Sequence, residues 1–174
     1  QPDFAWIKNR DAADAHALFD AVRGATKVLS SNATTAEDTN ADTLTAFESD
    51  GFALGDDVIV NTTNESYVAW QWKETATAGF DIVTYTGNGA NRTISHGLGV
   101  APSFVIVKSR NDTHDWYAWT PALSGTEFLV LNTTAAKGTS SPEVWNSTVP
   151  TSSVVSIGTS IGVNRNTYNY VMYC

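Results

Sequence analysis

Aromatic and polar side chains that could bind a sugar gather in one segment of the chain. Trp116 and Tyr117 directly follow His114 and Asp115, and Trp145 lies further along in another polar stretch. Sugar-binding sites use such combinations, because the C–H groups of a sugar ring pack on flat aromatic faces while its hydroxyls bond polar side chains. We therefore predict that these five residues form a glycan-binding surface. The alternative is that the aromatic rings pack in a core or between subunits.

A second candidate site is a group of three aspartates, Asp50, Asp56 and Asp57, which lie beside Gly51 and Gly55. Calcium prefers oxygen ligands and is often held by carboxylate-rich loops. These residues therefore predict a structural Ca²⁺ site, and we expect no other cofactor. The competing interpretation is an ordinary solvated acidic turn, because the matching positions later in the chain carry no carboxylate.

Catalytic chemistry is not favoured by any residue pattern. A Ser-His-Asp triad needs a histidine placed between a nucleophile and a carboxylate, and the three histidines show no such spacing. A glycosidase needs two carboxylates about 5–10 Å apart, but the spacing of the 18 acidic residues selects no pair. Zinc-type Cys/His spacing is also missing from the sequence. We therefore expect that the protein is not an enzyme.

The composition argues against nucleic acids and membranes as partners. The chain has 174 residues and a net charge of −8, and its ten basic residues are scattered singly. Nucleic-acid binding requires clustered Lys and Arg, so we expect no nucleic-acid partner. Apolar runs are too short for a membrane helix, so membrane insertion is not expected. Cys174 is the only cysteine, which leaves no internal disulfide.

The chain repeats itself with an offset of about one hundred residues, so that residues 2–10 return as residues 102–110. We predict two copies of one unit, at residues 1–73 and 74–174. The shared positions are mostly turn formers and apolar residues, whereas the candidate reactive groups are not shared. The repeat therefore indicates a common scaffold. Matched pairs include Phe4 and Phe104, Lys8 and Lys108, Arg10 and Arg110, Asn32 and Asn132, Gly55 and Gly158, Asn61 and Asn164, and Tyr67 and Tyr170.

Short alternating apolar runs occur in both units and are typical of strands with one buried face. Together with frequent turn signals they predict an all-β fold, an antiparallel β-sandwich of jelly-roll or lectin-like type. Residues 11–22 have a helix-like composition, but we expect a strand at residues 15–20, because residues 111–122 are poor helix formers.

The second unit begins with an additional segment, residues 79–99, that has no counterpart in the first. Gly87-Asn88-Gly89 lies between two alternating runs, which predicts a β-hairpin. The first unit lacks this element, and an uncovered sheet edge promotes association. We therefore expect another copy of the chain, or another protein, to pair with that edge.

The repeated segments, taken together, resemble an uncharacterised tandem β-repeat domain of bacteriophage virion proteins. Such proteins are frequent in marine phages and are often described as tail-fibre or structural proteins. The resemblance covers nearly the whole chain, implies a component of a virion or appendage, and transfers no catalytic residue. It rests on residues 2–10, 18–20, 23–27, 29–32, 50–55, 61, 67–70 and 96–102.

These observations predict a non-enzymatic structural and adhesive module of a virus particle or extracellular appendage, such as a tail fibre or surface decoration. We expect it at the virion surface or outside the cell. Its expected partners are copies of itself or other virion proteins, and host surface glycans. The first alternative is a free-standing secreted carbohydrate-binding module or lectin. The second is a polysaccharide-degrading enzyme.

Overall fold

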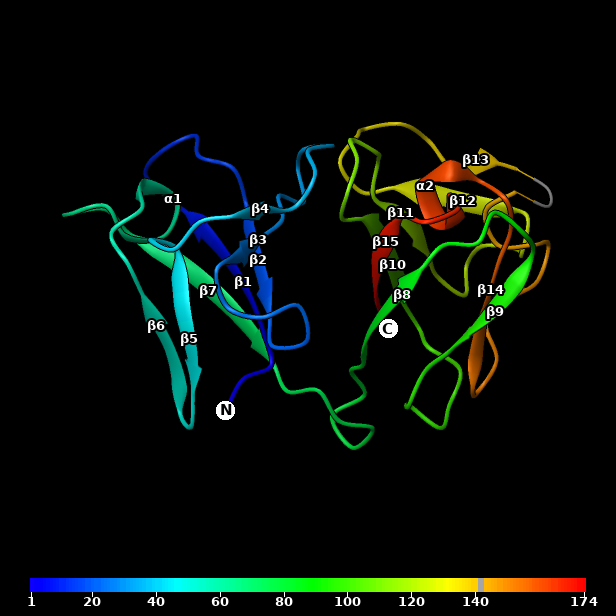
Figure 1. Cartoon of the computed structure of the whole chain (residues 1–174), viewed down its shortest axis with the longest axis horizontal. Helices are drawn as coiled ribbons and strands as arrows, with labels where there is room; N and C mark the ends of the chain where they lie inside the picture. The colour runs from blue at the N-terminus through cyan, green and yellow to red at the C-terminus, as the bar shows by residue number, and fades with distance from the viewer. Residues whose placement is uncertain (141–142) are drawn as a thin grey trace.

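The structure of the protein is a computed structural model, which describes residues 1–140 and 143–174. It confirms the predicted all-β class with antiparallel pairing (Figure 1). The two helices, α1 (Val58–Asn61) and α2 (Ile161–Asn164), are single turns. The strands are β1 (Phe4–Asn9), β2 (Ala17–Asp20), β3 (Lys27–Val28), β4 (Asp38–Thr39), β5 (Leu44–Glu48), β6 (Gly51–Leu54), β7 (Tyr67–Trp72), β8 (Ile82–Thr86), β9 (Arg92–Ser95), β10 (Val105–Ser109), β11 (Tyr117–Trp119), β12 (Glu127–Val130), β13 (Gly138–Thr139), β14 (Val154–Ile157) and β15 (Asn169–Tyr173).

Each half of the chain contributes one principal sheet. The first sheet has the strand order β2-β1-β7, and the second has the order β13-β12-β11-β10-β15-β8. All strand pairs in both sheets are antiparallel. Small two-stranded sheets complete the described fold, β3-β4 and β5-β6 in the first half and β9-β14 in the second. Figure 1 shows the two halves side by side, joined by the segment that leaves β7.

Both faces of the central strands are buried, because alternate side chains of a strand point to opposite faces. In β1, Phe4 belongs to a cluster that also contains residues of the second sheet, whereas Ala5 and Ile7 face a core within the first half. In β10, Ile106 belongs to the shared cluster and Val107 to the core of the second half. The shared cluster is therefore the hydrophobic contact between the halves.

The strand predicted at residues 15–20 is confirmed, since β2 occupies Ala17–Asp20. The hairpin predicted within residues 79–99 is wrong. Strand β8 pairs with β15, and β9 pairs with β14, so the two strands do not pair with each other. The Gly87-Asn88-Gly89 segment bonds instead to the stretch between the end of α2 and the start of β15. The Gly87 amide donates to Tyr168 O at 2.7 Å, and the Gly89 amide donates to Asn164 O at 2.9 Å.

Gly87 is required by this close approach. A Cβ atom at residue 87 would lie only 2.2 Å from the backbone oxygen of Arg165. No backbone shift of a few tenths of an ångström could relieve so short a contact. The glycine therefore serves tight packing of two backbone segments rather than a hairpin turn.

Polar contacts also join the halves, and several of them involve residues 30–37 of the first half. The buried Lys108 ammonium donates to Thr34 O at 3.1 Å and to Ser109 O at 2.9 Å. Burial lowers the pKa of Lys108 to about 8, against an opposing influence of Asp112 and Asp115. The Glu37 carboxylate accepts from Arg110 of the second half at 2.8 and 2.9 Å. The relative placement of the halves is therefore held by directed bonds as well as by apolar packing.

Within residues 1–140 and 143–174, no helix has the length and apolar character needed to span a membrane.

Candidate functional site

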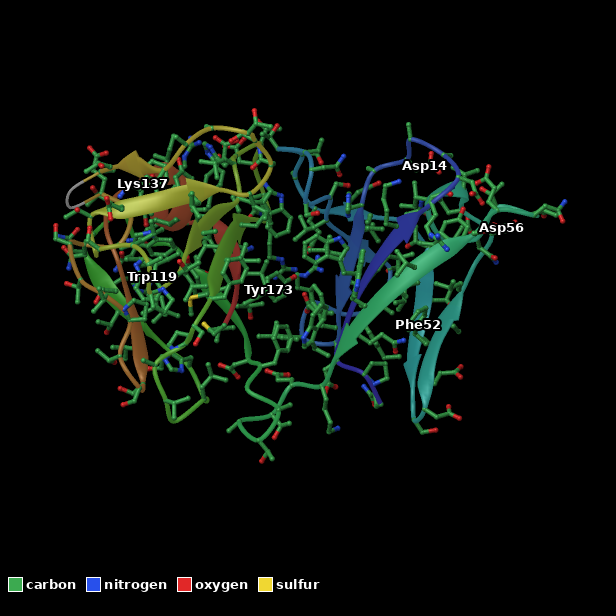
Figure 2. The ribbon with its side chains drawn as sticks, turned by 180° about the vertical axis from the view of Figure 1, so that it is seen from behind. Asp14, Phe52, Asp56, Trp119, Lys137 and Tyr173 are labelled. Carbon is green, nitrogen blue, oxygen red and sulfur yellow. The ribbon has the colours of Figure 1, made fainter. Side chains whose placement is uncertain are left out.

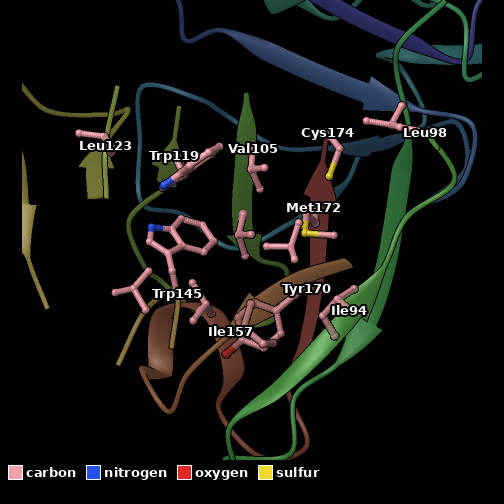
Figure 3. Packing of buried hydrophobic residues seen from close by; sticks show 14 residues of the cluster. Ile94, Leu98, Val105, Trp119, Leu123, Trp145, Ile157, Tyr170, Met172 and Cys174 are labelled. Carbon is pink, nitrogen blue, oxygen red and sulfur yellow. The ribbon is translucent and has the colours of Figure 1, made fainter. Parts of the chain in front are cut away.

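The indole rings of Trp116 and Trp145, predicted to contact a glycan, are buried. Trp116 is 0% exposed and Trp145 is 1% exposed. Trp116 lies in the cluster shared by the halves, and Trp145 lies in the core of the second half (Figure 3). Neither ring presents a face to solvent, so the alternative interpretation, core packing, describes these two residues.

The remaining members of the predicted glycan surface are partly exposed, and each contacts another residue of the protein. The Tyr117 ring packs against Phe128, with the ring centroids 5.3 Å apart. Asp115 accepts a hydrogen bond from Asn132 Nδ2 at 2.8 Å. His114 Nε2 lies 3.5 Å from the Asp112 carboxylate. Through Asn132, Asp115 contacts the lining of the groove described below.

The three aspartates do not form the predicted Ca²⁺ site. Asp50 follows β5 at the turn of the β5-β6 hairpin, whereas Asp56 and Asp57 follow the far end of β6. The Asp57 carboxylate caps α1 by accepting from the Ile59 amide at 2.9 Å and also accepts from Asn40 at 2.7 Å. Figure 2 shows Asp56 at the outer end of the first half. Within residues 1–140 and 143–174, no three His, Cys, Asp or Glu side chains could hold a metal ion together.

A groove of about 630 Å³ lies where the loops after β3 and β12 meet. We call it the interloop groove. Its loops are equivalent in the sequence repeat, and they place Asn32 and Asn132 in the same groove. The lining residues are Trp6, His16, Ser31, Asn32, Leu131, Asn132, Thr133 and Thr134.

Hydrogen bonds with the same geometry in both halves hold the two asparagines. The His16 amide donates to Asn32 Oδ1, and the Trp116 amide donates to Asn132 Oδ1, both at 2.9 Å. The Asn132 side-chain nitrogen is used by Asp115. The Asn32 side-chain nitrogen has no hydrogen-bond partner among the described residues, and Asn32 is exposed. Its two N–H groups are therefore available to a ligand.

Trp6 and His16 form the aromatic wall of the interloop groove. Trp6 Nε1 donates to His16 Nδ1 at 2.8 Å, and the two rings meet edge to face. Partial burial, together with the charge of Lys8, lowers the pKa of His16. The imidazole is therefore neutral at pH 7, and since Nδ1 accepts from Trp6, its proton lies on Nε2.

The lining of the interloop groove thus offers an indole and an imidazole, amide groups, and the hydroxyls of Ser31, Thr133 and Thr134. No Lys, Arg, Asp or Glu is among its lining residues. Neutral donors and acceptors beside an aromatic wall suit a neutral, hydroxyl-rich ligand. The recurrence of Asn32 at Asn132 is the signal in the sequence for this site. From the sequence alone, this recurrence indicates only a shared scaffold.

A second cavity, of about 420 Å³, lies between the halves and is mainly apolar. Phe4 and Phe80 meet edge to face in its wall with centroids 5.5 Å apart, and Tyr173 stacks on Phe80 at 6.3 Å. Figure 2 shows Tyr173 between the two halves. The Tyr173 hydroxyl is committed to Asp20, to which it donates at 2.7 Å. This cavity therefore offers few polar groups that could orient a ligand.

No curated protein and no solved structure matches the chain. A family model described as "Domain of unknown function (DUF7483)" matches residues 1–174. Because the match extends over the whole sequence, the chain belongs to this DUF7483 family.

Proposed function

We propose that this protein is a non-enzymatic structural and adhesive module of a virus particle or extracellular appendage, and that its interloop groove contacts neutral surface glycans. The observation that carries the glycan contact is the uncharged lining of the groove, where aromatic rings, amides and hydroxyls lie together. The net charge of −8 adds to this preference, because it disfavours anionic ligands. The placement on a virion is supported by the sequence resemblance alone.

We also infer that residues 1–73 and 74–174 are tandem copies of one unit whose principal sheets pack as a β-sandwich. The strand registers support this inference. Lys8 pairs with Val68 in the first sheet, and Lys108 pairs with Val171 in the second. The order β2-β1-β7 corresponds to β11-β10-β15.

Contacts around the two helical turns support the same inference. Tyr67 Oη donates to Val58 O at 2.7 Å, and Tyr170 Oη donates to Ile161 O at 2.6 Å. In addition, the side-chain amides of Asn61 and Asn164 each donate at 2.8 Å to the carbonyl of a glycine six residues earlier in the chain. Residues that recur in both halves therefore serve to cap helices and fix turns, which is a scaffold role rather than a catalytic one.

The glycan contact is tested by a double variant, Asn32→Asp with Thr134→Val. Asn32→Asp retains the oxygen that accepts from the His16 amide but removes the free N–H donors, and Thr134→Val removes an exposed hydroxyl without changing its shape. Loss of two ligand hydrogen bonds, each worth about 1 kcal/mol, should weaken binding about tenfold or more. The wild type is screened on a glycan array, and the affinity for the best neutral glycan is then measured by calorimetry.

The matched control is Asn166→Ala, an exposed asparagine outside the groove. It should bind the same glycan with unchanged affinity, and all variants should keep the wild-type melting temperature within a few degrees. A wild type that binds no neutral glycan on the array would refute the glycan contact. Equal affinity of wild type and double variant would remove the groove as the site.

A further inference from the structure

We propose that the outer edge of β7 is a strand-addition site that takes an extended peptide segment with the chemistry of β8. This inference goes beyond the proposed function, because it concerns a different surface and a peptide partner and does not depend on glycan binding. It is carried by the contrast between β7 and its counterpart β15, whose equivalent edge is occupied.

The outer edge of β7 is unpaired. Strand β7 is the last strand of the first sheet and pairs with β1 on its inner side. The Arg10 amide donates to Ser66 O at 2.8 Å, and since antiparallel strands bond through alternate residues, Val68 and Trp70 also bond toward β1. Tyr67, Ala69 and Gln71 therefore direct their N–H and C=O groups outward. These outward groups have no hydrogen-bond partner in the described parts of the chain.

The second half shows what pairs with this edge when it is occupied. Strand β8 pairs antiparallel with β15, with Tyr170 opposite Tyr85 and Met172 opposite Val83. Asp81 and Cys174 exchange two backbone hydrogen bonds of 3.0 Å just beyond the strand ends. By the offset of the repeat, Tyr170 and Met172 correspond to Tyr67 and Ala69. The groups that bond β8 in one half are thus the groups that point into solvent in the other.

Exposure follows the same contrast. Tyr173 of β15, the counterpart of Trp70, is 4% exposed, whereas Trp70 and Trp72 of β7 are 45% and 41% exposed. Exposure of two large indole rings to water is unfavourable, and an added strand would cover part of their surface. The apolar surface of β7 therefore favours a partner over solvent.

Strand β7 also carries none of the features by which proteins block free edges. Natural edge strands are protected by proline, by charged side chains or by bulges. The six residues of β7, Tyr-Val-Ala-Trp-Gln-Trp, contain neither proline nor charge. The register with β1 is continuous over all six residues, so no bulge interrupts it. The edge is open and regular.

The chemistry of the occupant is read from β8. Its residues, Ile-Val-Thr-Tyr-Thr, are β-branched or aromatic, which suits an extended backbone. On one face Val83 and Tyr85 pack against the core of the second half, whereas on the other face Ile82 is buried and Thr84 and Thr86 are exposed. Only one face of the segment therefore needs to be apolar along its whole length. The partner is thus an extended segment of about five to seven residues with free backbone N–H groups on one edge, as in other cases of strand addition.

The test uses the full chain and a synthetic peptide with the sequence of residues 79–91. Binding is followed by the fluorescence of the exposed tryptophans and by hydrogen exchange. Asp81 and Gly87 both donate toward β15, so the amides of Val83 and Tyr85 face the same way and that of Thr84 faces away. A peptide N-methylated at Val83 and Tyr85 should bind at least tenfold more weakly. The matched control, N-methylated at Thr84, should bind like the unmodified peptide.

Hydrogen exchange locates the peptide. Binding should protect the amides of Tyr67, Ala69 and Gln71, while the amides of β15 stay as protected as before. Equal binding of all three peptides, or no binding at all, would overturn the proposal. The proposal would also be overturned if the peptide protected amides outside β7 or replaced β8 in its own sheet. A dimer of the chain that covers β7 and excludes the peptide would overturn it as well. The glycan-site double variant should bind the peptide normally, so failure of either proposal can be told from failure of the other.

Discussion

Replacing Glu37 with glutamine is expected to lower the free energy of unfolding by about 3 to 5 kcal/mol, because it breaks a buried ionic network by removing one partner. Glu37 accepts from Arg23 at 3.0 Å and from Arg110 at 2.8 Å, and the Arg23 side chain is 0% exposed. Arg23 also pairs with the buried Asp20. Two arginines and two acids balance in charge, and the glutamine variant leaves one positive charge without compensation.

Urea denaturation monitored by tryptophan fluorescence measures this change. The matched control is Glu127→Gln, which removes a carboxylate of the same type from an ion pair with Lys137, whose side chain is 54% exposed. Solvent screens that pair, so the control should unfold almost like the wild type. A Glu37 variant as stable as the control would mean that the network does not hold the halves together.

The effect of Glu37→Gln should also depend on pH. Burial acts to raise the pKa of Glu37, but the hydrogen bonds and charges of Arg110 and Arg23 outweigh it and hold that pKa below its ordinary value. A carboxyl with a lowered pKa in the folded state stabilises the fold above its unfolded pKa, and this contribution is lost as pH falls through the folded pKa. The difference between wild type and variant should therefore be constant near pH 7 and shrink below about pH 4.5.

The fold class could be predicted from the sequence because it depends on local patterns. Alternation within runs such as residues 4–8 and 104–108 reflects the period of a strand, and both runs form strands at the centre of a sheet. Strand pairing could not be predicted in the same way. Residues 87–89 carry the residues of a hairpin turn, but partners distant in sequence, at residues 164–168, take their hydrogen bonds instead.

The prediction that Trp116 and Trp145 are exposed is wrong, because a polar neighbourhood in sequence does not indicate exposure. Trp116 follows two polar residues, yet its side chain points into the contact between the halves, where the first half supplies its hydrogen-bond acceptors. The interloop groove was missed for the converse reason. Asn32 and Asn132 are a hundred residues apart, and their approach depends on how the two sheets pack.

Trp116→Ala is expected to lower the free energy of unfolding by about 3 to 5 kcal/mol, because it removes a large buried ring and leaves a cavity. The Trp116 indole is 0% exposed. Its Nε1 donates to Ser30 O at 2.9 Å and to Ala33 O at 3.1 Å, both in the first half. The ring therefore contributes apolar contact and hydrogen bonding to the same junction between the halves.

The matched control is Trp70→Ala, which truncates the same side chain on β7, where it is 45% exposed. Because half of this ring already contacts water, the substitution should cost about 1 kcal/mol or less. Chemical denaturation of both variants in parallel separates the effect of burial on stability from the effect of removing a tryptophan as such. If Trp116 were instead part of a glycan surface, Trp116→Ala would abolish glycan binding and leave stability near that of the control. If Trp116→Ala instead loses stability while its folded fraction binds glycan with wild-type affinity, Trp116 belongs to the junction between the halves. The sugar contact then lies elsewhere.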